Sequence, residues 1–161
     1  MKEIYLAGGC FWGTQKFFDQ FDGVLETEVG YANGKILNPT YEQVCHENTG
    51  HAETVRIKFD ENVISVGKLL DMYFMTINPL SVNRQGADVG VQYRTGIYYE
   101  DESLLPAIEE KIAEETEKAG QPLAVEVKPL ENFSSAEEYH QKYLDKNPGG
   151  YCHIPARLMK L

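Results

Sequence analysis

The sequence has no apolar segment of about 18 residues, the length that indicates a membrane-spanning helix. The residues before Gly8 are too few to form the apolar part of a secretory signal. Positive charge is also scarce, since 15 lysines and arginines stand against 25 aspartates and glutamates and give a formal net charge of −10. Such a chain repels phosphate backbones and anionic lipid headgroups. We therefore expect a soluble, unprocessed cytoplasmic protein that binds neither nucleic acid nor membranes.

Cysteine is scarce as well, and its spacing argues against a disulfide scaffold or a metal site. Cys10, Cys45 and Cys152 form an odd set with no close pair, which favours free thiols in a reducing compartment. The chain has no Cys-x-x-Cys spacing, and in the pairs Cys45-His46 and Cys152-His153 adjacent side chains point apart on an extended chain. We expect no metal ion.

Length and composition indicate one domain, residues 1–161, because a chain of this size with 42% apolar residues can bury a single core. The apolar pattern predicts strands at 4–7, 24–31, 51–59, 97–99 and 125–127, and helices from residue 10 and at 41–45, 66–77, 103–119 and 136–143. The order resembles the split βαβ of ferredoxin-like folds. We expect an α+β two-layer sandwich with a ferredoxin-like core and a mixed sheet.

Two segments outside these elements, the C-terminal tail and one long loop, are expected to have functional roles. Residues 146–161 are interrupted by glycines and prolines, which disfavour a regular element and predict an irregular, mobile tail that carries Cys152. The loop at 77–93 is long for a compact domain, and loops of that length are commonly functional.

Cys10 follows two glycines at the start of a predicted helix. The unpaired amides and the dipole at a helix N-terminus favour a thiolate, which is a nucleophile. Phe11 and Trp12 are placed to form one wall of an apolar pocket. The alternative is a buried structural cysteine beside an ordinary core tryptophan.

Other cysteine chemistries fit less well. A phosphatase loop places an arginine where this chain has Lys16, so phosphate chemistry is not expected. A cysteine protease or acyl transferase needs a histidine base, but no local motif places His51, His140 or His153 beside Cys10. That class stays open.

Glu53 is in phase with Val55, Ile57 and Phe59 on the predicted strand at 51–59 and would point toward the core. Burial raises the pKa of a carboxyl group, so Glu53 would stay protonated near neutral pH and serve as a general acid. A strand that begins one residue later would instead leave Glu53 at a solvated edge. Both interpretations stay open.

Eight blocks of sequence together resemble one family, the A-type peptide methionine sulfoxide reductases. The blocks are Gly8-Gly9-Cys10-Phe11-Trp12-Gly13, Gly30-Tyr31-Ala32, Asn38-Pro39-Thr40-Tyr41, Val44-Cys45, Thr49-Gly50-His51-Ala52-Glu53, Asp88-Val89-Gly90-Val91-Gln92-Tyr93-Arg94, His140-Gln141-Lys142-Tyr143-Leu144 and Asn147-Pro148-Gly149-Gly150-Tyr151-Cys152. The resemblance implies an enzyme that reduces the S epimer of methionine sulfoxide, free or in oxidised proteins, to methionine.

The resemblance also implies roles for individual residues. Cys10 would attack the sulfoxide sulfur, and Glu53 would protonate or hydrogen-bond the departing oxygen. The hydroxyl groups of Tyr41 and Tyr93 would donate to the same oxygen, with Asp88 as a polar member of that network. These five residues are the implied reaction centre.

Phe11 and Trp12 would hold the S-methyl group. Loss of methionine would leave Cys10 as a sulfenic acid, which Cys152 would convert to a Cys10–Cys152 disulfide before irreversible oxidation. Thioredoxin or a similar thiol reductant would then reduce the disulfide, so no cofactor is expected. Cys45 is assigned a structural role, and we expect a monomer.

Two alternative functions share a reactive cysteine with this interpretation. A thiol peroxidase would use Cys10 and a resolving thiol but would not need a methyl pocket or a buried acid. A non-enzymatic module would bind methionine or sense oxidation through Cys10. Replacing Cys10 by serine separates them, since a catalyst loses turnover while a binding module keeps its affinity.

Overall fold

The computed structural model describes residues 1–46 and 49–160. Within these residues the main sheet contains β1 (Lys2–Ala7), β2 (Val24–Ala32), β3 (Ala52–Phe59), β6 (Gly96–Tyr99), β7 (Glu126–Pro129) and β8 (Phe133–Ser135), and a small hairpin contains β4 (Arg84–Gln85) and β5 (Asp88–Val89). The helices are α1 (Phe11–Phe18), α2 (Tyr41–His46), α3 (Val66–Thr76), α4 (Leu105–Ala119) and α5 (Tyr143–Lys146). Short 3₁₀ turns occupy Val91–Tyr93, Glu102–Leu104, Glu138–His140 and Ala156–Lys160.

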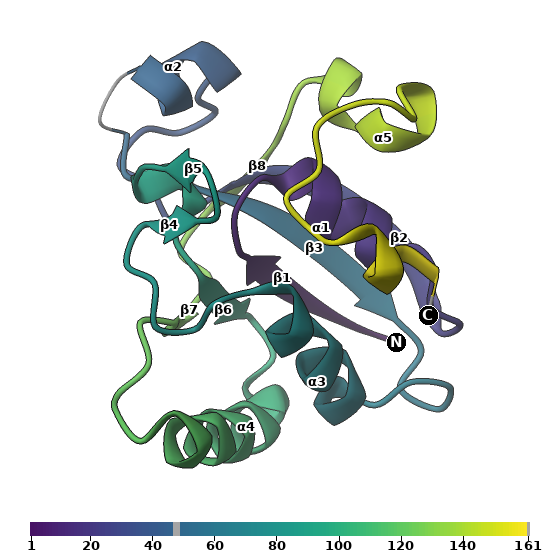
Figure 1. Cartoon of the computed structure of the whole chain (residues 1–161), viewed down its shortest axis with the longest axis vertical. Coiled ribbons are helices and arrows are strands. Elements are labelled where there is room, and N and C mark those ends of the chain that lie inside the picture. Colours follow the sequence, from purple (N-terminus) through teal and green to yellow (C-terminus); the bar gives the residue numbers. More distant parts are fainter. Residues whose placement is uncertain (47–48, 161) are drawn as a thin grey trace.

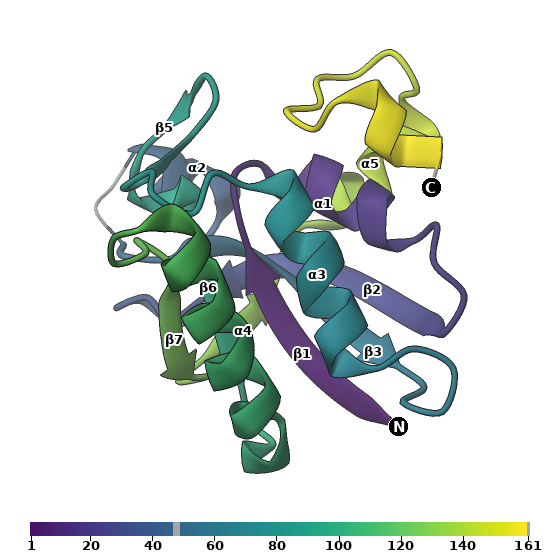
Figure 2. The same cartoon turned by 60° about the horizontal axis from the view of Figure 1, so that its bottom comes forward.

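The strand order of the main sheet is β7-β6-β1-β3-β2-β8. All neighbours run antiparallel except β6 and β7, which are parallel, so the sheet is mixed. Helices α1 and α3 lie on one face of the sheet, and α4 packs beside α3 (Figures 1 and 2). The predicted α+β fold with a mixed sheet is confirmed. None of the helices within the described residues is long and apolar enough to cross a membrane.

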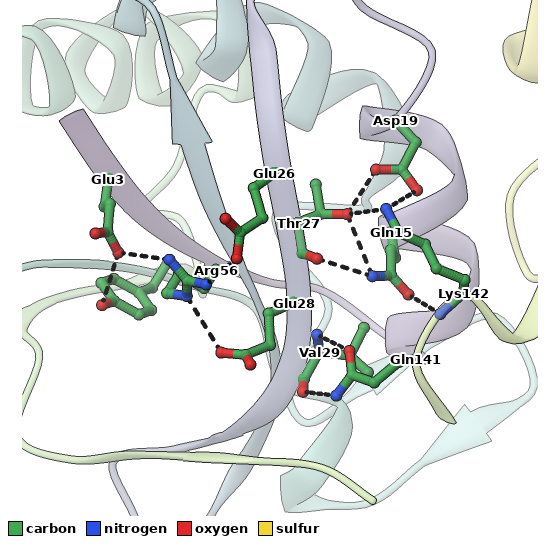
Figure 3. A network of polar contacts seen from close by, with 11 residues as sticks. Glu3, Gln15, Asp19, Glu26, Thr27, Glu28, Val29, Arg56, Gln141 and Lys142 are labelled. Atoms are coloured by element: carbon green, nitrogen blue, oxygen red, sulfur yellow. Dashed lines mark hydrogen bonds and ion pairs between the residues drawn. The ribbon is translucent and has the colours of Figure 1, made fainter. Parts of the chain in front are cut away.

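Alternation along the strands separates the two faces of the sheet. On β3, Val55, Ile57 and Phe59 are fully buried in the main core, as their spacing predicts. Arg56 points to the opposite face. There its guanidinium contacts Glu3 on β1 and Glu26 and Glu28 on β2, at 3.0, 2.7 and 3.2 Å (Figure 3). The charged cluster therefore lies on the face that α1 and α3 do not cover.

The predicted start of α3 and the predicted end of α4 are confirmed, whereas α3 ends one residue earlier than predicted and α4 begins two residues later, after a 3₁₀ turn. The Ser65 hydroxyl accepts a hydrogen bond from the Lys68 amide at 3.1 Å and caps the start of α3. Pro106 lies in the first turn of α4, and Gly120 follows its last residue.

The prediction of a helix at 136–143 is wrong. The structure has a single 3₁₀ turn at Glu138–His140, and the backbone then leaves helical geometry. Lys142 has a φ of 55°, in the left-handed region, and α5 begins only after it. The helix is therefore broken where the sequence pattern continues it.

Tertiary hydrogen bonds explain the break (Figure 3). The Gln141 side chain accepts from the Val29 amide at 3.0 Å and donates to the Val29 carbonyl at 2.9 Å. The Lys142 ammonium donates to Asp19 at 2.7 Å and to the Thr27 hydroxyl at 2.8 Å. These contacts tie the segment to α1 and β2, and together they outweigh the local helical preference.

The C-terminal tail packs against the domain. Ile154 and Leu158 are 4% and 5% exposed and belong to the main core. The tail is not irregular throughout, because Ala156–Lys160 forms a 3₁₀ turn. Its mobility stays a prediction, and three residues of the predicted 1–161 domain (47, 48 and 161, the last also in the tail) lie outside the described residues.

Candidate active site

Cys10 lies at the helix start that the sequence predicts. Strand β1 ends at Ala7, and Gly9 then turns the chain with a φ of 78° while its amide donates to the Tyr93 carbonyl at 3.2 Å. Cys10 is the N-cap residue of α1 and is 8% exposed. Its thiol therefore faces the site from a rigid junction between strand and helix.

Glu53 is buried beside this junction, with 1% of its surface exposed. One carboxyl oxygen accepts a hydrogen bond from the Phe11 amide at 3.2 Å, and the other is buried with no hydrogen-bond partner among the described residues. Burial raises the pKa of Glu53 to about 8, although the Phe11 amide opposes the shift. Of the two open interpretations, the inward-pointing acid is the one observed, and it is mostly protonated at neutral pH.

The expectation of a thiolate at Cys10 is wrong for this structure. Burial and then the charge of Glu53 raise the pKa of Cys10, and the hydrogen bond from the Trp12 amide only partly opposes them. The helix start does favour the anion, but the thiol is too far from solvent for that to dominate. Cys10 is therefore a neutral thiol at rest.

Tyr41, Tyr93 and Asp88 converge on the same place from separate segments. Tyr93 ends the 3₁₀ turn after the β4–β5 hairpin, and burial followed by the charge of Glu53 raises the pKa of its hydroxyl. Burial, Cys45 and Glu53 together raise the pKa of Tyr41, the first residue of α2. The carboxylate of Asp88 in turn raises the pKa of Glu53. The long loop at 77–93 thus supplies two of the predicted site residues.

Trp12 is held from two sides and is partly exposed. Its indole nitrogen donates to His140 Nδ1 at 2.9 Å, and its ring stacks on Tyr143 at 3.8 Å with an interplanar angle of 12°. Phe11 is 1% exposed, with its ring 5.3 Å from His140. Trp12 therefore keeps part of its surface accessible, while Phe11 is buried.

The tail brings Cys152 onto α1, as Figure 1 shows for the yellow segment. A Cβ atom at Gly13 would lie 3.0 Å from Cys152 Sγ and 3.2 Å from His153 Nδ1. Cys152 is close enough to raise the pKa of Cys10, and both residues carry free thiols. Cys152 also lies in the wall of a hollow of about 710 Å³ beside the tail.

The structure adds two histidines to the predicted site, His140 and His153. His140 is 1% exposed, and burial lowers its pKa, so its Nδ1 lone pair is free to accept from Trp12. No spacing rule could place either residue, because each reaches α1 through tertiary contacts. The sequence does offer two signals for His140, its place in the block that begins at His140 and the indole N–H of Trp12, which needs an acceptor in a part-buried position. Among residues 1–46 and 49–160, no group of three or more metal-binding side chains is placed to hold a metal ion.

Comparison with known proteins gives one consistent result. The model of the family described as peptide methionine sulfoxide reductase matches residues 2–160. The peptide methionine sulfoxide reductase MsrA of Lachnoclostridium phytofermentans is 60% identical over 153 residues, which cover 95% of this chain and 92% of that protein. The crystal structure of reduced Mxr1 from Saccharomyces cerevisiae superimposes with a TM-score of 0.89 at 38% identity, covering 96% of this chain and 91% of that one. Mxr1 in complex with Trx2 gives a TM-score of 0.62 at 25% identity, over 88% and 84% of the two chains.

Proposed function

This chain belongs to the peptide methionine sulfoxide reductase family, whose members are oxidoreductases that reduce methionine sulfoxide to methionine, and we propose that it acts on the S epimer through Cys10. The observation that carries the proposal is the buried Glu53 carboxyl, which lies beside the helix start that presents Cys10. An acid and a thiol at one site meet the two demands of sulfoxide reduction: a proton for the oxygen and, as the thiol gives up its own proton, a nucleophile for the sulfur.

The proposed reaction transfers the sulfoxide oxygen to Cys10. Glu53 protonates the oxygen as the Cys10 sulfur attacks the sulfoxide sulfur, and the Cys10 thiol proton returns to Glu53. The hydroxyl group then passes from the substrate sulfur to the Cys10 sulfur, so the substrate S–O bond and the transient bond between the two sulfurs break while a Cys10 S–O bond forms. Methionine leaves, and Cys10 is a sulfenic acid. The sulfoxide is reduced by two electrons and Cys10 is oxidised by two. A positioned acid of this kind typically contributes about 10²- to 10⁴-fold.

The other site residues act on the same two atoms. Tyr41 and Tyr93 have pKa values raised by burial, so both keep their hydroxyl protons and can donate to the sulfoxide oxygen. After burial, the nearby Asp88 carboxylate also raises the pKa of Glu53 and favours its protonated form. Trp12, with Phe11 behind it, receives the S-methyl group against its exposed face.

Recycling uses the tail. Cys152 attacks the Cys10 sulfenic acid, forms a disulfide and releases water, and the tail moves to bring the sulfurs within bonding distance. Gly149 and Gly150 precede Cys152 and give the segment that freedom. A thioredoxin-like protein then reduces the disulfide by thiol exchange, as the complex of Mxr1 with Trx2 suggests. No metal ion or organic cofactor takes part in these steps.

The proposal also covers the topology of the core, the oligomeric state and the cellular compartment. The four strands in the order β6-β1-β3-β2, crossed by α1 and α3, form a ferredoxin-like core. The proposed cycle needs the residues of one chain only, so a monomer suffices for it. Its thiol chemistry suits the reducing environment of the cytoplasm.

The test uses reduced protein without added reductant. The protein is mixed with each sulfoxide epimer of a blocked methionine, the methionine formed is measured, and the thiols are mapped by mass spectrometry. We expect methionine from the S epimer only, together with a Cys10–Cys152 disulfide. Conversion that leaves Cys10 as a sulfenic acid would remove Cys152 from the mechanism. No conversion of either epimer, with rapid oxidation by peroxide, would overturn the proposal in favour of a thiol peroxidase.

A further inference from the structure

The tail contains a titratable side chain that the proposed cycle leaves unused, His153. Its imidazole lies in a depression on α1 that the glycines create. A Cβ atom at Gly9 would lie 2.8 Å from His153 Nε2, and one at Gly13 would lie 3.2 Å from His153 Nδ1. The same point at Gly13 is 3.0 Å from Cys152 Sγ. Cys152 and His153 are adjacent in the chain, yet both side chains face one spot on α1, close to Cys10.

We propose that His153 is the base of the disulfide-forming step and accepts the proton of the Cys152 thiol as Cys152 attacks oxidised Cys10. The inference rests on the proposed function, because it requires Cys10 to become a sulfenic acid. It adds to that function a catalytic residue in the resolving step.

The two ring nitrogens have different surroundings. Both nitrogens are buried, and neither has a hydrogen-bond partner among the described residues. Nε2 faces Gly9, and the Gly8 carbonyl raises the pKa of His153 against the larger lowering effect of burial. The tautomer that the proposal uses carries its proton on Nε2. Nδ1, on the Gly13 side with Cys152, then keeps its lone pair and is free to accept a proton.

Because burial dominates, the pKa of His153 is lowered and the ring is neutral near pH 7. Asp88 acts in the opposite direction and stabilises a proton on the ring. Asp88 is held in place by the Tyr151 hydroxyl, which donates to it at 2.9 Å. Arrangements that activate nucleophilic cysteines also combine a thiol, a base and an orienting group; here Asp88 acts on His153 through its charge and not through a hydrogen bond.

The proposed step balances without an outside reactant. The Cys152 sulfur attacks the Cys10 sulfur and displaces its hydroxyl group, so one S–S bond forms and one S–O bond breaks. Cys152 is oxidised and the sulfenic acid is reduced. The proton passes from the Cys152 thiol to Nδ1 and then to the departing hydroxide, which leaves as water. The base is needed because burial raises the pKa of Cys152 and keeps it a thiol.

The experiment separates the two chemical steps in a single turnover. Reduced protein reacts with the S-sulfoxide of a blocked methionine, and quenched samples are analysed for methionine, Cys10 sulfenic acid trapped by dimedone, and the Cys10–Cys152 disulfide. The variants are His153→Ala, His153→Gln and, as a matched control, His46→Gln, which replaces an exposed histidine at the end of α2. Imidazole and pyrazole, rings of the same size but very different basicity, are then added to His153→Ala.

We expect wild-type methionine formation in all variants, while disulfide formation in both His153 variants slows on the order of 100-fold and sulfenic acid accumulates. Imidazole should restore disulfide formation in His153→Ala, and pyrazole should not. Wild-type disulfide formation without His153, or equal rescue by both rings, would reduce His153 to a packing residue. Failure of wild-type protein to form methionine would overturn the proposed function itself, which is a different result.

Discussion

Glu53→Gln is the substitution that tests the proposed acid most directly. Glutamine keeps the shape of the side chain and an oxygen that can accept from the Phe11 amide, but it cannot release a proton. With a pKa of about 8, Glu53 is roughly nine-tenths protonated at pH 7 in the wild type. We expect methionine formation in the variant to fall by about 10²- to 10⁴-fold, the usual contribution of a general acid.

The same substitution should lower activity but make the stability of the protein less dependent on pH. Between the ordinary glutamate pKa of 4.5 and about 8, the unfolded chain loses the Glu53 proton while the folded chain keeps it. The free energy of unfolding therefore decreases as pH rises through this window, by about 5 kcal/mol from the shift of the pKa. Glu53→Gln removes this dependence, so its stability relative to the wild type should be several kcal/mol more favourable at pH 8 than at pH 5.

The two effects are measured on the same protein preparations. Single-turnover methionine formation is followed at pH 7, and urea unfolding gives the free energy of unfolding at pH 5 and pH 8. Glu110→Gln is the matched control, since it removes the same charge from an exposed position on α4. Wild-type methionine formation in Glu53→Gln would refute the acid. Equal stability differences at the two pH values would refute the buried, protonated state.

Three further predictions follow from contacts outside Glu53. Gly13→Ala introduces a Cβ atom 3.0 Å from Cys152 Sγ, so disulfide formation in a single turnover should slow at least severalfold while methionine formation keeps its wild-type rate. An unchanged rate of disulfide formation would mean that the tail does not react from this position. His140→Phe removes the acceptor of the Trp12 indole, so KM should rise more than kcat falls and the tryptophan fluorescence should change. A loss confined to kcat would mean that His140 does not position Trp12 for substrate binding. Ser65→Ala removes the hydroxyl that caps α3, so the free energy of unfolding should drop by about 1 kcal/mol while activity is retained. Urea unfolding identical to that of the wild type would show that this hydrogen bond does not stabilise the helix.

The features that sequence predicts well here are those decided by local chemistry. The alternation of Val55, Ile57 and Phe59 fixes which side of β3 faces the core, and it also places Glu53 inward. Ser65 predicts the start of α3 because its hydroxyl satisfies an amide that the helix leaves unpaired. In each case, the residues that determine the structure lie within a few positions of one another.

The features that sequence does not predict depend on distant partners. The break at Lys142 follows from hydrogen bonds of Gln141 to β2, which no local pattern reveals. The protonation of Cys10 depends on how deeply the finished fold buries it, and a helix N-terminus alone predicts the wrong state. Likewise, His140 becomes part of the site only because the segment after β8 returns to Trp12.

The packing of the tail explains why residues 9 and 13, on either side of Cys10, are glycines. A glycine next to a nucleophile suggests room for a substrate to approach the backbone, yet Cβ atoms at Gly9 and Gly13 would meet the side chains of His153 and Cys152. The space is occupied by the chain's own C-terminal tail. A larger residue at either position would therefore push the tail away from α1 before it obstructed a sulfoxide at the Trp12 face. On this argument, Gly9 and Gly13 serve the proposed recycling step more than the binding of the substrate.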